Sequence, residues 1–189
     1  MKAICIIGSP KDDGNTAQVV AKIIGGMSDI GIEVARYVLG STNIHFCKGC
    51  KSCYETRRCI QRDDVDTILE DLLTADIVLV ASPSYWGDVT GHLKVFIDRC
   101  LPLCNTIDGT TPVPSGKIGV AVAIRAGKSK GENQHLIDTI EHFFGHLKIN
   151  PSYRFSIEGV QTRTDLATKT FELERAYELG LEIGQSATS

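Results

Sequence analysis

The sequence is poor in several features that would place a protein in a particular class. It contains one tryptophan and two methionines among 189 residues, and no apolar run approaches the ~20 residues that cross a membrane. We find no low-complexity tract and no internal repeat, and a net charge of −3 does not favour general binding to nucleic acid. A strand pattern begins almost directly after Met1, so we expect no export signal, no membrane partner and a cytoplasmic protein.

The composition is that of one folded domain. With 42 % hydrophobic and 23 % charged residues, the chain can bury one substantial core, and we predict that residues 1–189 form a single domain. Cys5, Cys100 and Cys104 lie in or beside apolar segments, where a free cysteine usually packs as a small core residue.

Apolar runs alternate with helical spacings along the chain. The runs 2–8, 34–39, 77–81, 118–124 and 152–157 predict strands, and the patterns at 17–27, 65–73, 88–101, 136–147 and 166–181 predict helices. Five strands alternating with five helices predict an α/β fold, a doubly wound parallel sheet with helices on both faces. Ligands of such sheets bind beyond the carboxyl ends of the strands, where the strand order reverses.

Three loops are therefore expected to line one edge of the sheet. In the first, Gly8–Thr16, the backbone amides, the Ser9 and Thr16 hydroxyls and a helix N-terminus could together hold a phosphate dianion. This loop has neither the spacing of a dinucleotide fingerprint nor that of a Walker loop, and an ordinary strand–helix turn capped by Asn15 is the alternative.

The other two loops follow the third and fourth predicted strands. Tyr85 and Trp86, in the loop Ser82–Gly87, could pack against a flat heterocycle, while Gly87 would let backbone approach closely; packing in the core is the alternative for both rings. The loop Arg125–Glu132 is polar, and we predict that it closes over a ligand.

Four cysteines lie within thirteen residues, Cys47, Cys50, Cys53 and Cys59, in the pattern C-x2-C-x2-C-x5-C. Soft metals and iron–sulfur clusters need several thiolates that converge on one small volume, so the pattern indicates redox chemistry. A disulfide framework and a structural zinc site are the alternatives.

The cysteine segment is also basic. Residues 47–62 carry a charge of +4, against −7 for the rest of the chain. Positive neighbours lower thiolate pKa values and offset the negative charge of a four-thiolate cluster. A solvated basic face, or a docking patch for an acidic partner, explains the same charge.

These motifs together carry a family resemblance. Gly8-Ser9-Pro10 with Gly14-Asn15-Thr16, the cysteine run followed by Asp63-Asp64, and Ser82–Gly87 running on to Leu93–Arg99 resemble the flavodoxin-like NADPH-dependent FMN reductases. Within that group the chain resembles the iron–sulfur flavoproteins of anaerobic microbes. The resemblance is strong over about the first hundred residues and rests on pattern beyond them.

The resemblance implies a flavodoxin-like five-stranded sheet, one FMN per subunit and a [4Fe–4S] cluster. It places the FMN phosphate on Ser9, Lys11, Asn15 and Thr16. It places the flavin ring against Pro83, Ser84, Tyr85, Trp86 and Gly87, with Arg125 and Gly127 from the third loop. The cluster ligands it implies are Cys47, Cys50, Cys53 and Cys59, in a loop at about 45–62.

The function implied is electron transfer between a one-electron donor such as ferredoxin and a two-electron acceptor, and it needs no acid–base catalytic residue. An NAD(P)H-dependent FMN or quinone reductase without a cluster is one alternative. A zinc-stapled flavodoxin-like sensor or interaction protein is another.

The cysteine loop also bears on assembly. A neighbouring subunit would shield the cluster from water and oxygen, so we expect a homodimer or homotetramer.

Overall fold

A computed structural model describes residues 1–128 and 131–187 of the chain. Its centre is a five-stranded, wholly parallel sheet in the order β2-β1-β3-β4-β5. The strands are β1 (Lys2–Ile7), β2 (Glu33–Val38), β3 (Ile77–Pro83), β4 (Ile118–Ile124) and β5 (Asn150–Ile157). This is the flavodoxin-like order, in which the chain reverses direction across the sheet between β1 and β3, and it confirms the predicted fold class.

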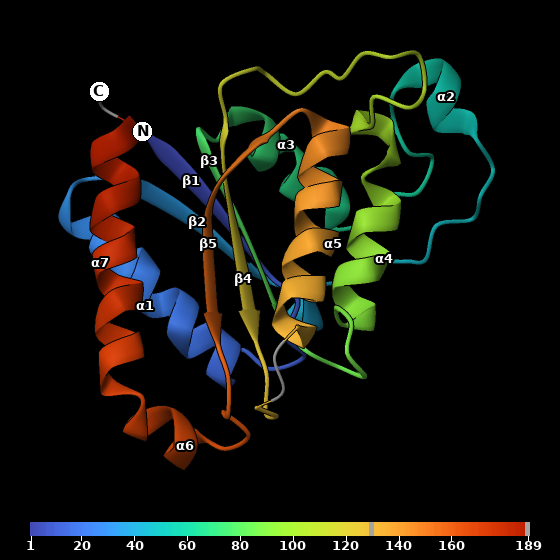
Figure 1. Ribbon diagram of the computed structural model, residues 1–189. Coiled ribbons are helices and arrows are strands. Elements are labelled where there is room, and N and C mark those ends of the chain that lie inside the picture. The colour runs from blue at the N-terminus through green and yellow to red at the C-terminus, as the bar shows by residue number, and fades with distance from the viewer. Residues whose placement is uncertain (129–130, 188–189) are drawn as a thin grey trace.

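Helices cover both faces of the sheet (Figure 1). On one face lie α1 (Asn15–Asp29) and α7 (Thr170–Ala187); on the other lie α3 (Val65–Thr74), α4 (Gly91–Arg99) and α5 (Glu132–Leu147). The short helices α2 (Ser52–Thr56) and α6 (Arg163–Thr168) lie outside these layers, and η1 (Leu39–Ser41) and η2 (Leu101–Leu103) are single 3₁₀ turns. No helix in 1–128 or 131–187 is both long and apolar enough for a membrane span.

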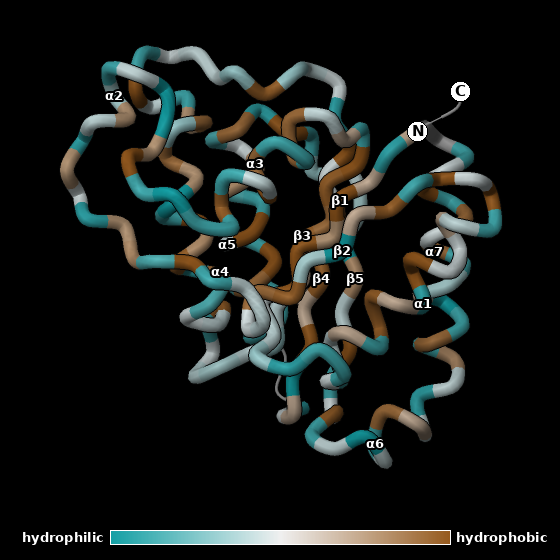
Figure 2. Tube along the Cα trace, turned by 180° about the vertical axis from the view of Figure 1, so that it is seen from behind, coloured by the Kyte–Doolittle hydropathy of each residue, from teal (hydrophilic) through white to brown (hydrophobic). Residues whose placement is uncertain are grey.

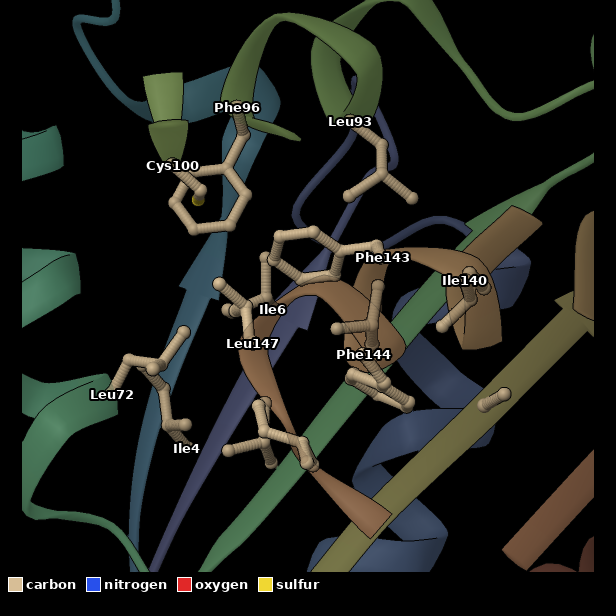
Figure 3. Packing of buried hydrophobic residues seen from close by; sticks show 14 of the residues in the cluster. Ile4, Ile6, Leu72, Leu93, Phe96, Cys100, Ile140, Phe143, Phe144 and Leu147 are labelled. Atoms are coloured by element: carbon tan, nitrogen blue, oxygen red, sulfur yellow. The ribbon is translucent and has the colours of Figure 1, made fainter. Parts of the chain in front are cut away.

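The core forms two layers because side chains of a strand alternate between the faces of the sheet. Ile4 and Ile6 of β1 point toward α3, α4 and α5, whereas Cys5 and Ile7 point toward α1 and α7. The apolar strands run through the middle of the molecule in Figure 2. Figure 3 shows the first layer, in which the Phe96 and Phe143 rings pack edge to face with centroids 6.4 Å apart.

The pair α1 and α7 crosses at two glycines. A Cβ atom on Gly26 would lie 2.1 Å from the carbonyl oxygen of Tyr177, and one on Gly180 would lie 2.1 Å from that of Ile23. The backbones of the two helices therefore approach each other as closely as they do only because neither residue has a side chain.

Two helix boundaries predicted from the sequence were wrong. The helix expected from residue 88 begins at Gly91, because the Thr90 hydroxyl caps it by accepting from the Leu93 amide at 3.2 Å. The single C-terminal helix expected over 166–181 is divided after Thr168, where α6 ends and Lys169 leaves the helical conformation. A capping box between Thr162 and Asp165 defines the start of α6.

Candidate functional site

A cavity of about 710 Å³ opens at the carboxyl edge of the sheet, beside the reversal between β1 and β3. Its volume lies within the range of small-molecule and cofactor sites. Its walls come from the three loops predicted to meet there and from the segment after β5. The lining residues are Ser9, Pro10, Lys11, Asp13, Gly14, Asn15, Thr16, Pro83, Ser84, Tyr85, Ile124, Arg125, Ala126, Val160, Gln161, Thr162 and Arg163.

One end of the cavity is the N-terminus of α1. Gly14 occupies the capping position and supplies no side-chain cap, and the first turn of the helix contains no acidic residue. The amides of this turn and the positive end of the helix dipole are therefore available to an anion. Gly14 also packs tightly against the loop, since a Cβ there would lie 3.2 Å from Ser9 Oγ.

The four residues predicted to hold a phosphate all line this cavity, but their side chains are not equally available. Ser9 is buried, and its Oγ both accepts from the Lys11 amide and donates to the Lys11 carbonyl, each at 3.2 Å. The side-chain nitrogen of Asn15, Nδ2, donates to the Thr162 carbonyl at 3.2 Å. The side-chain oxygen Oδ1 of the same residue is buried and has no partner among the described residues. Thr16 is 2 % exposed.

The second loop contributes Pro83, Ser84 and Tyr85 to the wall of the cavity, but neither Trp86 nor Gly87. The Tyr85 and Asp88 backbones pair across a tight turn whose two central residues, Trp86 and Gly87, have φ of 58° and 80°. Positive φ at both positions is the geometry of a two-residue hairpin turn, and it is unusual for a tryptophan. The Trp86 side chain is consequently fully exposed, while Tyr85 is half exposed.

The third loop is joined to the second by a buried arginine. The Arg125 guanidinium pairs with Glu132 at 2.5 Å, and the other oxygen of Glu132 accepts a hydrogen bond from the Ser84 hydroxyl. Gly127 does not line the cavity; a Cβ there would lie 2.4 Å from Arg125 Nη2, so its role is to leave room for the guanidinium. The predicted loop 125–132 includes positions 129 and 130, which lie outside the described residues.

Sequence reasoning missed the fourth wall, which residues 160–163 form after β5. Arg163 forms an ion pair with Asp13 of the first loop, and this hydrogen bond holds the pKa of Asp13 below its usual value. The topology could have predicted this wall. Because β5 is parallel to β4, the segment that follows β5 must emerge at the carboxyl edge of the sheet, beside the other loops.

These residues fit FMN. The unpaired α1 amides and Lys11 suit its phosphate, the orphaned Asn15 Oδ1 suits a hydroxyl donor such as those of the ribityl chain, and Pro83 and Tyr85 offer a flat apolar wall.

The cysteine segment forms a second, separate site. After η1 the segment runs along α4, and it forms the short helix α2 near the C-terminal end of α4 (Figure 1). Lys51 and Arg57, which flank α2, have φ of 61° and 54°, and Gly49 has φ of 63°. These left-handed residues turn the chain sharply, and all four predicted ligand cysteines line one cavity of about 170 Å³.

The thiols influence one another across this cavity. Burial raises the pKa of Cys53, and the Cys59, Cys47 and Cys50 sulfurs add to the effect. The hydroxyl and amide of Ser52 lower the pKa of Cys50 by hydrogen bonding. All seven cysteines are free, and in the described part of the chain no three potential ligands stand close enough to hold a metal ion.

Two arginines fasten the loop to the rest of the molecule. Arg57 donates to the Pro102 and Cys104 carbonyls at 3.3 and 3.0 Å and forms an ion pair with Asp108. Arg99 is buried under the loop and pairs with Asp63 at 2.6 Å.

The chemistry of this donor set fits a [4Fe–4S] cluster. Four thiols, half buried or exposed, share one cavity. The buried Arg99 guanidinium lies next to Cys59, and its Nε has no oxygen or nitrogen acceptor among the residues described. A hydrogen-bond donor next to sulfur ligands would stabilise the negative charge of such a cluster.

The family model for NADPH-dependent FMN reductases matches residues 1–158. An iron–sulfur flavoprotein of Archaeoglobus fulgidus is 36 % identical over all of this chain and 81 % of its own length. One from Methanocaldococcus jannaschii is 31 % identical, with 98 % of this chain and 96 % of the relative covered. Among solved structures, an FMN-dependent NADH-azoreductase from Bacillus anthracis in complex with FMN superposes with a TM-score of 0.75 at 13 % identity, covering 97 % and 100 %.

Proposed function

The chain belongs to the family of NADPH-dependent FMN reductases, and on this basis we propose that it carries FMN and a [4Fe–4S] cluster and moves electrons between a one-electron donor, such as ferredoxin, and a two-electron acceptor. As a member of that family it is a flavin-dependent oxidoreductase. The observation that supports the finer proposal is that one fold contains two cavities. One lies at the strand reversal and includes the uncapped N-terminus of α1, and the other is lined by four thiols.

The first cavity would hold FMN. The α1 amides, the Thr16 hydroxyl and the Lys11 ammonium would bind the phosphate, and the helix dipole would stabilise its charge. Pro83 and Tyr85 would border the ring. The Ser84–Glu132–Arg125 chain fixes two of the walls relative to one another.

The second cavity would hold the cluster through Cys47, Cys50, Cys53 and Cys59. A [4Fe–4S] cluster exchanges single electrons and FMN accepts one or two, so the two together connect one-electron and two-electron carriers. The chain's own residues bind and orient these groups and exclude water. We assign no residue to general acid or base catalysis.

We also propose a homodimer or homotetramer. The two cavities have no described lining residue in common, and the cysteine loop lies at the far end of α4 from the carboxyl edge of the sheet (Figure 1). Three large apolar side chains of the cysteine loop are exposed: Phe46 by 76 %, Tyr54 by 43 % and Ile60 by 56 %. A second subunit would cover these side chains and bring its own flavin cavity near the thiols. A monomeric mass by light scattering with both groups bound would contradict this proposal.

The proposed donor is a small acidic carrier such as ferredoxin in the cytoplasm. The charge of +4 on residues 47–62 would attract such a carrier, and the rate of electron delivery should then fall as salt screens the attraction.

The experiment that tests the proposed function is anaerobic purification, followed by an absorption spectrum and analysis of iron, sulfide and flavin. Broad brown absorption with flavin bands supports the proposal. Flavin bands alone indicate the cluster-free reductase, and zinc without iron indicates the zinc-stapled protein.

A pair of variants tests the ligand set. Cys59→Ala should lose the cluster and keep flavin at the wild-type level. Cys104→Ala, which changes a half-buried cysteine outside the set of four, should keep both. Equal iron in the two variants would remove Cys59 from the ligand set.

A further inference from the structure

A buried arginine lies beneath the cysteine loop at the C-terminal end of α4. Arg99 is 1 % exposed, and its Nη1 donates to the His45 carbonyl at 2.8 Å. Nη1 and Nη2 together form a bidentate pair with the Asp63 carboxylate, at 2.6 and 3.1 Å. A buried charge is tolerated only when it is paired and hydrogen-bonded in this way.

The partners of Arg99 are the two ends of the cysteine loop. His45 lies two residues before Cys47, and Asp63 lies four residues after Cys59. Asp63 also accepts from the His45 amide at 3.0 Å, so the two ends are bound to each other as well as to α4. One guanidinium therefore closes the base of the loop that carries all four thiols.

The third nitrogen of Arg99, Nε, is buried and has no oxygen or nitrogen acceptor in the part of the chain that the structure describes. The guanidinium lies next to the Cys59 sulfur, and an arginine side chain keeps its proton and its positive charge in folded proteins. The guanidinium thus stays charged beside one of the proposed ligands.

We propose that Arg99 is a positioning residue for the cluster: it ties both ends of the cysteine loop to α4, and its Nε supplies a hydrogen bond and a positive charge on the Cys59 side of the bound cluster. This inference rests on the proposed function. Reduction adds negative charge to a cluster, and hydrogen bonds and nearby cations stabilise that charge, so Arg99 raises the reduction potential.

A purely structural arginine would behave differently. It would hold the loop, and its replacement would change cluster content or stability, but the potential of any cluster retained would not move. The potential therefore separates the two roles, and Arg99→Lys, which keeps the charge but cannot form the bidentate pair, separates charge from geometry.

The test compares Arg99→Gln and Arg99→Lys with Arg62→Gln as the matched control. Arg62 also lies next to the loop, donating to the Cys59 carbonyl at 3.1 Å, but its side chain is 67 % exposed. The first readout is the cluster midpoint potential from an anaerobic spectroelectrochemical titration. We expect it to fall in Arg99→Gln, to lie between Arg99→Gln and wild type in Arg99→Lys, and to stay near wild type in Arg62→Gln. Equal potentials for the two Gln variants would overturn the proposal.

The second readout uses metal-free protein, so it is independent of the proposed function. Amide hydrogen exchange over residues 46–62 should become severalfold faster in both Arg99 variants and stay unchanged in Arg62→Gln. Unchanged exchange in the Arg99 variants would refute the tie between the loop ends. If wild type takes up no cluster under reconstitution, the proposed function fails, and hydrogen exchange still decides whether Arg99 organises the loop.

Discussion

The Thr16 hydroxyl provides a direct test of where a flavin phosphate binds. Thr16 lies in the first turn of α1 and lines the larger cavity, and its side chain forms no hydrogen bond to a described residue. Valine has almost the same shape as threonine, so Thr16→Val removes the hydroxyl and leaves the packing in place. The substitution should therefore change FMN binding without changing the fold.

The expected size of the effect follows from the charge of the ligand. A hydrogen bond to a charged group is worth about 1.5–3 kcal/mol, and 1.4 kcal/mol is a factor of ten, so FMN affinity should fall about tenfold to a hundredfold. The free energy of unfolding of flavin-free protein should change by less than about 0.5 kcal/mol. Ser9→Ala should differ, because its hydroxyl bonds within the loop, and it should also cost about 0.5–1.5 kcal/mol of stability.

Quenching of FMN fluorescence on titration with flavin-free protein measures the affinity, and urea unfolding measures the stability. Thr67→Val, in the first turn of α3 and outside the cavity, is the control and should bind FMN as wild type does. An unchanged affinity in Thr16→Val would refute the placement of the phosphate at the N-terminus of α1.

Three further predictions concern the fold that supports the sites. Gly26→Ala should destabilise the protein by about 1–3 kcal/mol in urea unfolding, because its Cβ would meet a carbonyl of α7, whereas Gly145→Ala, with open space around it, should stabilise α5 by about 0.5–1 kcal/mol. Burial alone would raise the pKa of Asp63, but hydrogen bonds lower it to about 2, so about 2 kcal/mol of stability should be present above pH 4 and lost as the pH falls toward 2; Asp63→Asn should lack this slope. Arg57→Ala should make the cysteine loop severalfold more sensitive to limited proteolysis, with exposed Arg58→Ala as the control.

The strands could be predicted from the sequence because each is a run of buried apolar residues between turn signals. The loops at their carboxyl ends followed from topology, and the first loop, Pro83 and Tyr85 line the cavity as predicted. The direction of the Trp86 side chain could not be predicted, because it depends on a backbone φ of 58° that tryptophan rarely adopts.

Contacts between residues far apart in the sequence explain the other features that could not be predicted. The cap at Thr90 is part of a contact with β1, in which its hydroxyl donates to the Gly8 carbonyl at 2.5 Å across 82 positions of sequence. The Arg99–Asp63 pair spans 36 positions, and the Lys-Val-Phe-Ile-Asp-Arg pattern that contains Arg99 reads locally as an ordinary helix end. Such partners are chosen by the folded topology and have no signature in a short window of sequence.

The fourth wall of the larger cavity has a consequence for the order of events during biosynthesis. Asn15 bonds to the Thr162 carbonyl and Arg163 to Asp13, contacts that join positions 147 and 150 residues apart. A chain still emerging from the ribosome has the first loop, Gly8–Thr16, long before it has β5 and the segment that closes the cavity. Flavin therefore cannot guide the early folding of this protein, and its uptake should begin only after residues 160–163 have left the exit tunnel.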